Sequence, residues 1–83
     1  MLATVTMYST VWCGHCRRLK RQLDEAGVPF VEIDIERPEH RHLGDRIEAH
    51  TGGYRTVPTL EIGGELYVNP ALTEVLHVVR RAG

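Results

Sequence analysis

The first 35 residues change their apolar periodicity twice, and this change limits the folds that the chain can adopt. Segment 3–8 (ATVTMY) alternates small or polar residues with apolar ones, which predicts a strand. From Gly14 to Ala26 the apolar and sulfur-containing positions recur at helical spacing, and Gly27 then ends the helix. Segment 29–35 (PFVEIDI) alternates again. A strand, a helix and a strand within about 30 residues predict a right-handed βαβ unit with parallel strands.

The second half of the chain predicts a helix, a hairpin and a last helix. A proline suits the first turn of a helix over residues 38–50. Gly63 and Gly64 separate the short segments VPTLEI and ELYV, which predicts a two-residue hairpin turn. Asn69 can cap the last helix, with Pro70 at its first position. The expected order is βαβ-α-ββα, an α/β class, in a single domain that spans residues 1–83.

Length, charge and the start of the chain exclude several classes of function. The chain has 83 residues and a net charge of -1, so it lacks the basic field of nucleic-acid-binding domains. Its first ten residues contain neither a basic segment nor a long apolar run, so we expect no signal peptide and no membrane anchor. We therefore expect a cytoplasmic protein in a reducing compartment, monomeric and without nucleic-acid or membrane partners.

The only two cysteines, Cys13 and Cys16, form a Cys-Gly-His-Cys motif where the first strand leads into the first helix. A disulfide between them would close a very short loop and so would stabilise the fold little. Zinc needs four ligands, and His40 and His42 lie more than twenty residues away without ligand spacing. In a reducing compartment such a pair is usually catalytic or metal-binding. We interpret it as a redox pair and expect no bound metal.

The position of each cysteine assigns its role. Cys13 falls at the helix N-terminus, where unpaired N–H groups and the macrodipole favour a thiolate, the form that attacks disulfides. Four basic residues and no acidic one lie between positions 13 and 23, and they favour the same charge. Cys16 lies one turn further along on the inward face, within reach of Cys13. We expect Cys13 to be an exposed nucleophile and Cys16 a buried resolving thiol.

Two residues of the motif are candidates for the surface that binds substrate. Trp12 either faces the substrate or packs as a lid on the motif. His15 lies between the cysteines, where a histidine can stabilise the reduced thiolate. We therefore expect a less strongly reducing pair than a proline at this position would give.

A second constellation follows in GGYRTVPT (52–59) and VNP (68–70). With the WCGHC motif, the Gly-Gly hairpin and the closing helix, it makes nearly the whole chain resemble the glutaredoxin branch of the thioredoxin superfamily. The resemblance implies the thioredoxin/glutaredoxin fold, a central four-stranded mixed sheet flanked by three helices. It also implies that Val57–Pro58 is a cis peptide facing the cysteines, and that the Val57 backbone pairs with the substrate's cysteine like a strand.

Parts of this constellation resemble the mycoredoxins, the glutaredoxins that work with mycothiol in actinobacteria. The match lies in RTVPT (55–59), in VNP, and in the absence of the Gly-Gly that opens the last helix of glutathione-using members. The resemblance implies mycothiol as co-substrate and no bound cofactor, with Arg55, Thr56 and Asn69 among the binding residues. Arg55 could instead be an exposed strand-edge charge, and Asn69 a plain helix cap.

The sequence thus predicts a thiol–disulfide oxidoreductase that reduces mixed disulfides between proteins and mycothiol. One alternative is a general disulfide-reducing redoxin that receives electrons from thioredoxin reductase or glutathione. Another is a glutaredoxin that holds an iron–sulfur cluster between two subunits through its first cysteine. The WSGFRP segment usual in small redoxins that use thioredoxin reductase is missing, and Cys16 stands where cluster-binding members usually carry serine.

Overall fold

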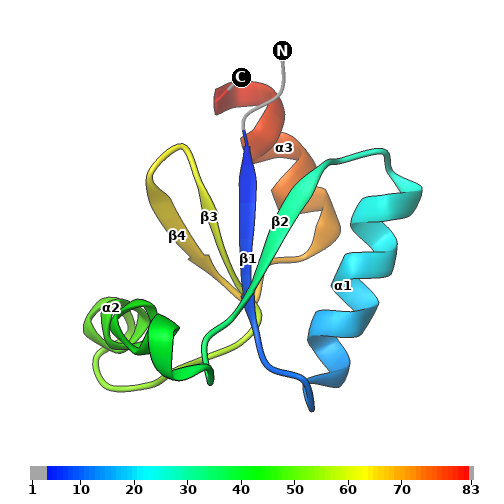
Figure 1. Ribbon diagram of the computed structural model, residues 1–83. Helices are drawn as coiled ribbons and strands as arrows, with labels where there is room; N and C mark the ends of the chain where they lie inside the picture. Colours follow the sequence, from blue (N-terminus) through cyan, green and yellow to red (C-terminus); the bar gives the residue numbers. More distant parts are fainter. Residues whose placement is uncertain (1–3, 83) are drawn as a thin grey trace.

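The computed structural model describes residues 4–82 and has the architecture that the sequence predicts (Figure 1). Four strands form one mixed sheet in the order β2-β1-β3-β4. The strands are β1 (Val5–Ser9), β2 (Phe30–Asp34), β3 (Thr59–Ile62) and β4 (Glu65–Val68). The helices are α1 (Gly14–Glu25), the 3₁₀ turn η1 (Pro38–His40), α2 (Arg41–Thr51) and α3 (Leu72–Ala82). The thioredoxin/glutaredoxin fold is confirmed.

The strand directions bring the chemistry-bearing segments to one end of the sheet. β1 runs parallel to β2 and antiparallel to β3, and β4 returns antiparallel to β3. Gly63 and Gly64 have φ angles of 60° and 84°, which the expected hairpin turn requires at both positions. In Figure 1 the end of β1, the start of α1 and the start of β3 meet at the lower end of the sheet. The cysteine motif and the Val57–Pro58 peptide therefore lie at the same end of the sheet.

The helices cover the two faces of the sheet unequally: α1 and α3 lie on one face and α2 on the other (Figure 1). Alternation along β1 sends Val5 and Met7 into the larger core, under α1 and α3, and Tyr8 into the smaller core, under α2. The larger core also contains Leu19, Leu23, Leu60, Ile62, Val75, Val78 and Val79. Its packing fixes α1, and with it the cysteine motif, against the end of β1.

The expected cap of the last helix is wrong, because α3 begins at Leu72, two residues after Pro70. Asn69 has a φ of 47°, a left-handed conformation that asparagine tolerates better than most residues. Its backbone N–H donates to the Pro58 carbonyl at 2.8 Å. Asn69 therefore joins the end of β4 to the loop that carries Pro58.

The helix expected over residues 38–50 divides into two parts. Its first turn is the 3₁₀ turn η1, and α2 then ends at Thr51 with Gly52 as a left-handed C-cap (φ 83°). Ile47 is buried and Leu43 half-buried, so these two residues form the inward face of this helix. In α1, the last position of the apolar pattern, Ala26, is exposed because it is already the C-cap.

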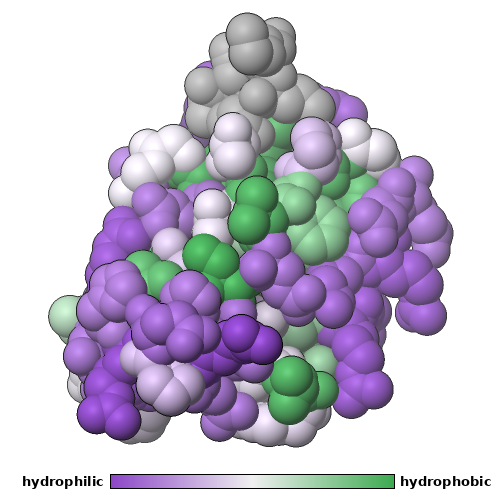
Figure 2. All heavy atoms as spheres, viewed as in Figure 1, coloured by the Kyte–Doolittle hydropathy of each residue, from purple (hydrophilic) through white to green (hydrophobic). Residues whose placement is uncertain are grey.

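Hydrophilic side chains dominate the face seen in Figure 2, over α2 and α1, and hydrophobic groups show mainly between them. Val31 on the edge strand β2 is one of the exposed large apolar residues; Val11 and Trp12, just before the cysteine motif, and Tyr54, after α2, are others. Within residues 4–82, no helix combines the length and the apolar character that a membrane crossing requires.

Candidate functional site

Cys13 is the N-cap of α1, and its sulfur closes the open end of the helix. The residue has extended backbone angles (φ -85°, ψ 111°), and its Sγ accepts the backbone N–H of Cys16 at 3.1 Å. The first turn of α1 contains no acidic residue. The Cys13 sulfur thus lies where both the macrodipole and an amide favour negative charge.

The expectation of an exposed nucleophile needs correction. Only 6% of Cys13 is exposed, against 1% of Cys16. The reason is the hydrogen bond to the Cys16 amide, which folds the Cys13 side chain back over the first turn of α1. Cys13 is therefore the more accessible of two buried cysteines.

Cys16 lies on the inward face of α1, as expected, and its surroundings keep it protonated. Burial, followed by the hydrogen bond to Cys13, raises the pKa of the Cys16 thiol to about 12. Near neutral pH Cys16 is therefore a thiol rather than a thiolate. A protonated, buried Cys16 agrees with the role of resolving cysteine, and the position of the Cys13 sulfur at the helix N-terminus agrees with the role of attacking cysteine.

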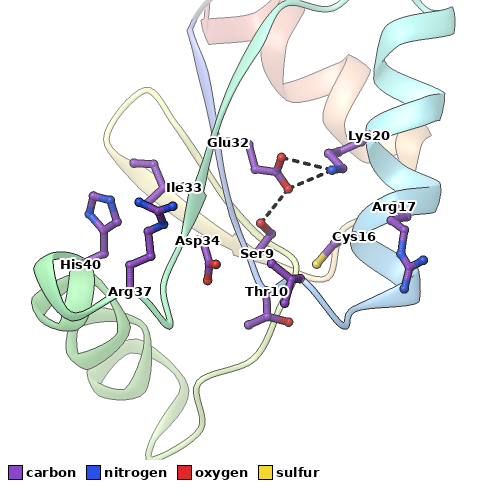
Figure 3. Close-up of a pocket in the computed structure, with 11 residues that line it drawn as sticks. Ser9, Thr10, Cys16, Arg17, Lys20, Glu32, Ile33, Asp34, Arg37 and His40 are labelled. Carbon is purple, nitrogen blue, oxygen red and sulfur yellow. Dashed lines mark hydrogen bonds and ion pairs between the residues drawn. The ribbon is translucent and has the colours of Figure 1, made fainter.

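A cavity of about 500 Å³ opens beside Cys16, between α1 and the edge strand β2 (Figure 3). Glu32 on β2 reaches toward Lys20 on α1, with the Nζ atom 3.1 Å from the carboxylate, and accepts the Ser9 hydroxyl at 2.8 Å. The Thr10 hydroxyl, also at this wall, is buried without a hydrogen-bond partner within residues 4–82. The cavity therefore places several polar groups next to the resolving sulfur.

The basic residues of α1 do not all act on the cysteines. Lys20 pairs with Glu32, and Arg21 lies 3.9 Å from Glu25 one turn further along. Such half-exposed or exposed pairs contribute little stability. Arg17 and Arg18 have no carboxylate partner in the part of the chain that the structure describes. They are the basic side chains of this segment that stay available to an approaching molecule.

The Val57–Pro58 peptide is cis, which confirms the expectation from the resemblance. Pro58 is buried, and Val57 is half-buried against the smaller core under α2. The Thr59 hydroxyl donates to the Thr56 carbonyl at 2.7 Å, and the Asn69 N–H donates to the Pro58 carbonyl. The loop is thus held from both sides, and Thr56 contributes to its shape through its carbonyl.

The other expected binding residues lie on two sides of this loop rather than in one cluster. Trp12 and Arg55 line a cavity of about 530 Å³. His15 and Asn69, with Pro58, line a smaller cavity of about 270 Å³ between α1 and the start of α3. An elongated ligand attached to Cys13 could therefore extend in either direction.

Trp12 and Arg55 are both fixed by carboxylates that the sequence pattern did not single out. Trp12 is 65% exposed, and its indole Nε1 donates to Glu36 at 2.8 Å, so it is not a lid packed on the motif. The Arg55 guanidinium donates from Nε to Glu48 at 2.8 Å and also pairs with Asp45. Arg55 precedes β3 and is therefore not an unpartnered strand-edge charge.

Gly44 is the other residue that the sequence pattern did not assign to the site. A Cβ atom at Gly44 would overlap the Arg55 guanidinium, so the glycine makes room for that side chain on α2. The segment LGDRIE (43–48) contained a signal for this arrangement. Asp45 and Glu48 are three positions apart and so share one face of the helix, and Gly44 leaves space beside that face because it has no side chain. No group of three or more metal-ligand side chains occurs in residues 4–82.

The chain is similar to glutaredoxins in sequence and in structure. The glutaredoxin family model matches residues 5–67. Mycoredoxin 1 of Corynebacterium glutamicum is 34% identical over 76 residues, which cover 90% of this chain and 91% of that protein. A glutaredoxin of Pseudomonas aeruginosa is 39% identical over 80 residues, covering 95% and 87% of the two chains. The buckwheat glutaredoxin–glutathione complex superposes with a TM-score of 0.77 at 22% identity, over 98% and 80% of the two chains, and shares the fold.

Proposed function

The chain belongs to the glutaredoxin family and is a glutaredoxin-type thiol–disulfide oxidoreductase with a Cys13–Cys16 pair, and we propose that it reduces mixed disulfides between proteins and mycothiol. The observation that carries the chemistry is the Cys13 sulfur at the N-terminus of α1, hydrogen-bonded to the Cys16 amide. The choice of mycothiol rests on the RTVPT and VNP segments and on the similarity to mycoredoxin 1. The protein acts in the cytoplasm as a monomer.

In the first step the Cys13 thiolate attacks the mycothiol sulfur of the mixed disulfide. A sulfur–sulfur bond forms between Cys13 and mycothiol, while the bond between mycothiol and the protein breaks. The released protein thiolate takes a proton from the solvent. The target protein is thereby reduced, and the oxidising equivalents remain on Cys13.

Two routes clear mycothiol from Cys13. In one, the thiolate of a second mycothiol attacks the bound mycothiol sulfur, which frees the Cys13 thiolate and forms mycothiol disulfide. In the other, Cys16 attacks the Cys13 sulfur, which expels mycothiol and leaves a Cys13–Cys16 disulfide. Because its pKa is raised to about 12, Cys16 must lose a firmly held proton before it attacks, so the second route is the more sensitive to pH.

The test is the release of mycothiol from a mycothiolated reporter protein by wild type, Cys13→Ser and Cys16→Ser. Loss of the nucleophile should lower the rate by about a thousandfold or more. Cys16→Ser should keep activity when mycothiol is present in excess. Retained activity in Cys13→Ser would show that another group is the nucleophile.

A parallel assay with a glutathionylated reporter tests glutathione, the second candidate co-substrate. The buckwheat relative was crystallised with glutathione, so that class of thiol suits the shared fold. Faster release of mycothiol than of glutathione supports the proposal. Equal or faster release of glutathione would contradict it.

A further inference from the structure

The cavity of about 500 Å³ beside the resolving cysteine (the Cys16 cavity) contains ionisable groups without a role in the proposed reaction. It lies between α1 and the edge strand β2 (Figure 3). Only 1% of Cys16 is exposed, so its thiol proton has no direct path to the bulk solvent. The Cys16 cavity is polar and large enough to hold water, and it offers such a path.

The charged and titratable side chains of the Cys16 cavity come from α1, from β2 and from the segment after β2. They are Arg17, Lys20, Glu32, Asp34, Arg37 and His40. In Figure 3, Arg37 and His40 lie on the side of the cavity away from Cys16. The Asp34 carboxylate accepts the backbone N–H of Glu36 at 2.9 Å, in the turn after β2. Glu32 is therefore the acidic side chain of this cavity best placed to take a proton from Cys16.

Two neighbours hold the Glu32 carboxylate at this wall. The Lys20 Nζ atom lies 3.1 Å from each of its oxygens, and the buried Ser9 hydroxyl donates to one of them at 2.8 Å. Lys20 follows Cys16 by four residues, so both side chains lie on one face of α1. A carboxylate has about four lone-pair sites, so these three contacts leave it able to accept a proton.

Cys16 needs such an acceptor, because near neutral pH it is a thiol. Burial, followed by the hydrogen bond to Cys13, raises the pKa of Cys16 to about 12, and the negative charge of Glu32 acts in the same direction. Through its charge alone, Glu32 would slow the attack by Cys16. As a proton acceptor it would speed the attack. The two roles therefore predict opposite effects when Glu32 is replaced.

From this arrangement we propose that Glu32 is the proton acceptor for Cys16 in the step that clears a mixed disulfide from Cys13. The Cys16 sulfur bonds to the Cys13 sulfur, and the bond from Cys13 to the outgoing thiol breaks, with its electron pair leaving on that thiol. The Cys16 proton passes through water in the cavity to Glu32, which gives it to the solvent. The cysteines are thereby oxidised to a disulfide, and the outgoing thiol is reduced. Lys20 and Ser9 are positioning residues for the carboxylate.

The proton leaves Cys16 only as the new sulfur–sulfur bond forms. At that point the sulfur gives electron density to the bond and becomes more acidic, so a carboxylate is a sufficient base. The inference rests on the proposed function, because it takes Cys16 as the resolving cysteine. It holds for any outgoing thiol, since the proton comes from Cys16 and not from that thiol.

The test uses an aromatic disulfide, 5,5′-dithiobis(2-nitrobenzoate), in about one equivalent per reduced protein. Attack by Cys13 releases one coloured thionitrobenzoate and leaves the other bonded to Cys13. Attack by Cys16 then releases the second, so the second release measures the step assigned to Glu32. Cys16→Ser should give the first release only, which identifies the two phases.

Glu32→Gln should slow the second release by about tenfold or more at pH 7. The variant must react through the free Cys16 thiolate, whose fraction rises tenfold with each pH unit well below its pKa, so its rate should rise in that proportion between pH 7 and pH 9. The wild-type rate should rise less steeply. Ser9→Ala, which removes one bond to the carboxylate, should show a smaller decrease with the same steeper pH dependence.

Glu25→Gln is the matched control, because Glu25 is an exposed carboxylate that lies beside a basic residue of α1, Arg21. It should keep the wild-type rate and pH dependence. An unchanged or faster second release in Glu32→Gln would show that Glu32 acts on Cys16 only through its charge and would overturn the inference. Equal slowing in Glu25→Gln would overturn it as well.

A carboxylate supplied in solution separates proton transfer from a structural effect. In Glu32→Ala the second release should be slow, and sodium formate should raise its rate in proportion to the formate concentration. Sodium chloride at the same ionic strength should not. If formate has no more effect than chloride, Glu32 is not the proton acceptor.

This inference and the proposed function fail in distinguishable ways, because the aromatic disulfide contains no mycothiol. If Glu32→Gln slows the second release but wild type leaves mycothiol on the reporter protein, the role of Glu32 stands and the choice of mycothiol is wrong. If wild type releases mycothiol but Glu32→Gln does not slow the second release, the function stands and the role of Glu32 is wrong.

Discussion

At the scale of single residues, Cys13 and Cys16 lie only three positions apart in the chain, yet their sulfur atoms have different surroundings. The Cys13 sulfur accepts a backbone N–H at the open end of α1. Cys16 is buried on the inward face, and burial together with the hydrogen bond to Cys13 raises its pKa to about 12. Both effects follow from where β1 passes into α1, and neither needs a metal or an additional charged side chain.

This difference predicts selective alkylation of the folded protein. Iodoacetamide should label Cys13 between pH 7 and pH 9 and leave Cys16 unlabelled, because alkylation requires a thiolate and the Cys16 thiol keeps its proton in this range. Mass spectrometry of peptides across the pH series measures both sites. In urea both cysteines should react, which provides the control. Labelling of Cys16 at neutral pH at a rate close to that of Cys13 would contradict the assignment.

At the scale of elements, α2 joins the smaller core to the loop that carries Arg55. Ile47 packs into that core, and Arg46 Nη1 donates to Glu61 on β3 at 2.6 Å. Glu61 also accepts the Tyr8 hydroxyl at 2.6 Å. These bonds fix α2 on the sheet. Two carboxylates of the same helix, those of Asp45 and Glu48, hold Arg55.

The bond between Tyr8 and Glu61 predicts a loss of stability at alkaline pH. Burial, followed by the hydrogen bond to Glu61, raises the pKa of Tyr8 to about 12 from its ordinary value of 10.0. The unfolded chain therefore releases the tyrosine proton first. The stabilising contribution of Tyr8 is complete below pH 10 and is lost as the pH rises toward about 12. The raised pKa of Cys16 acts in the same direction from pH 9 upward.

Tyr8→Phe should lower the free energy of unfolding by about 1–2 kcal/mol at pH 7, because it removes a partly buried hydrogen bond to a carboxylate. It should also reduce the decline in stability between pH 10 and pH 12. Urea unfolding at pH 7, 9 and 11 measures both effects. Tyr54→Phe is the matched control, since Tyr54 is 71% exposed. A decline in Tyr8→Phe as steep as in wild type would contradict this account.

Sequence patterns sufficed for elements that local chemistry determines, and they failed where distant residues interact. The βαβ unit, the Gly63–Gly64 turn and the position of Cys13 each follow from neighbouring residues. The start of α3 does not: the backbone N–H of Asn69 donates to the Pro58 carbonyl across the end of the sheet, and the helix begins only at Leu72. By helix propensity alone Gly44 only weakens α2, whereas in the structure it makes room for the side chain of Arg55, eleven residues later.

At the scale of the whole molecule, the strand order places the reaction and the recognition of the ligand at one end of the sheet. β1 leads into the cysteine motif there, Val57 and Pro58 lie there in the loop before β3, and α2 holds Arg55 in the same loop. The chain's net charge of -1 gives no strong long-range attraction for an anionic thiol. Selection between thiols must therefore arise from contacts at this end of the sheet.

The measurement that tests the central claim most directly is the reduction of the oxidised Cys13–Cys16 protein by three electron donors in parallel. The donors are mycothiol, glutathione at the same concentration, and NADPH with thioredoxin reductase, and the rate is followed by the appearance of free thiols. We predict that mycothiol reduces the protein about tenfold faster than either of the other donors. An equal or faster rate with glutathione or with thioredoxin reductase would contradict the assignment of this protein to mycothiol chemistry.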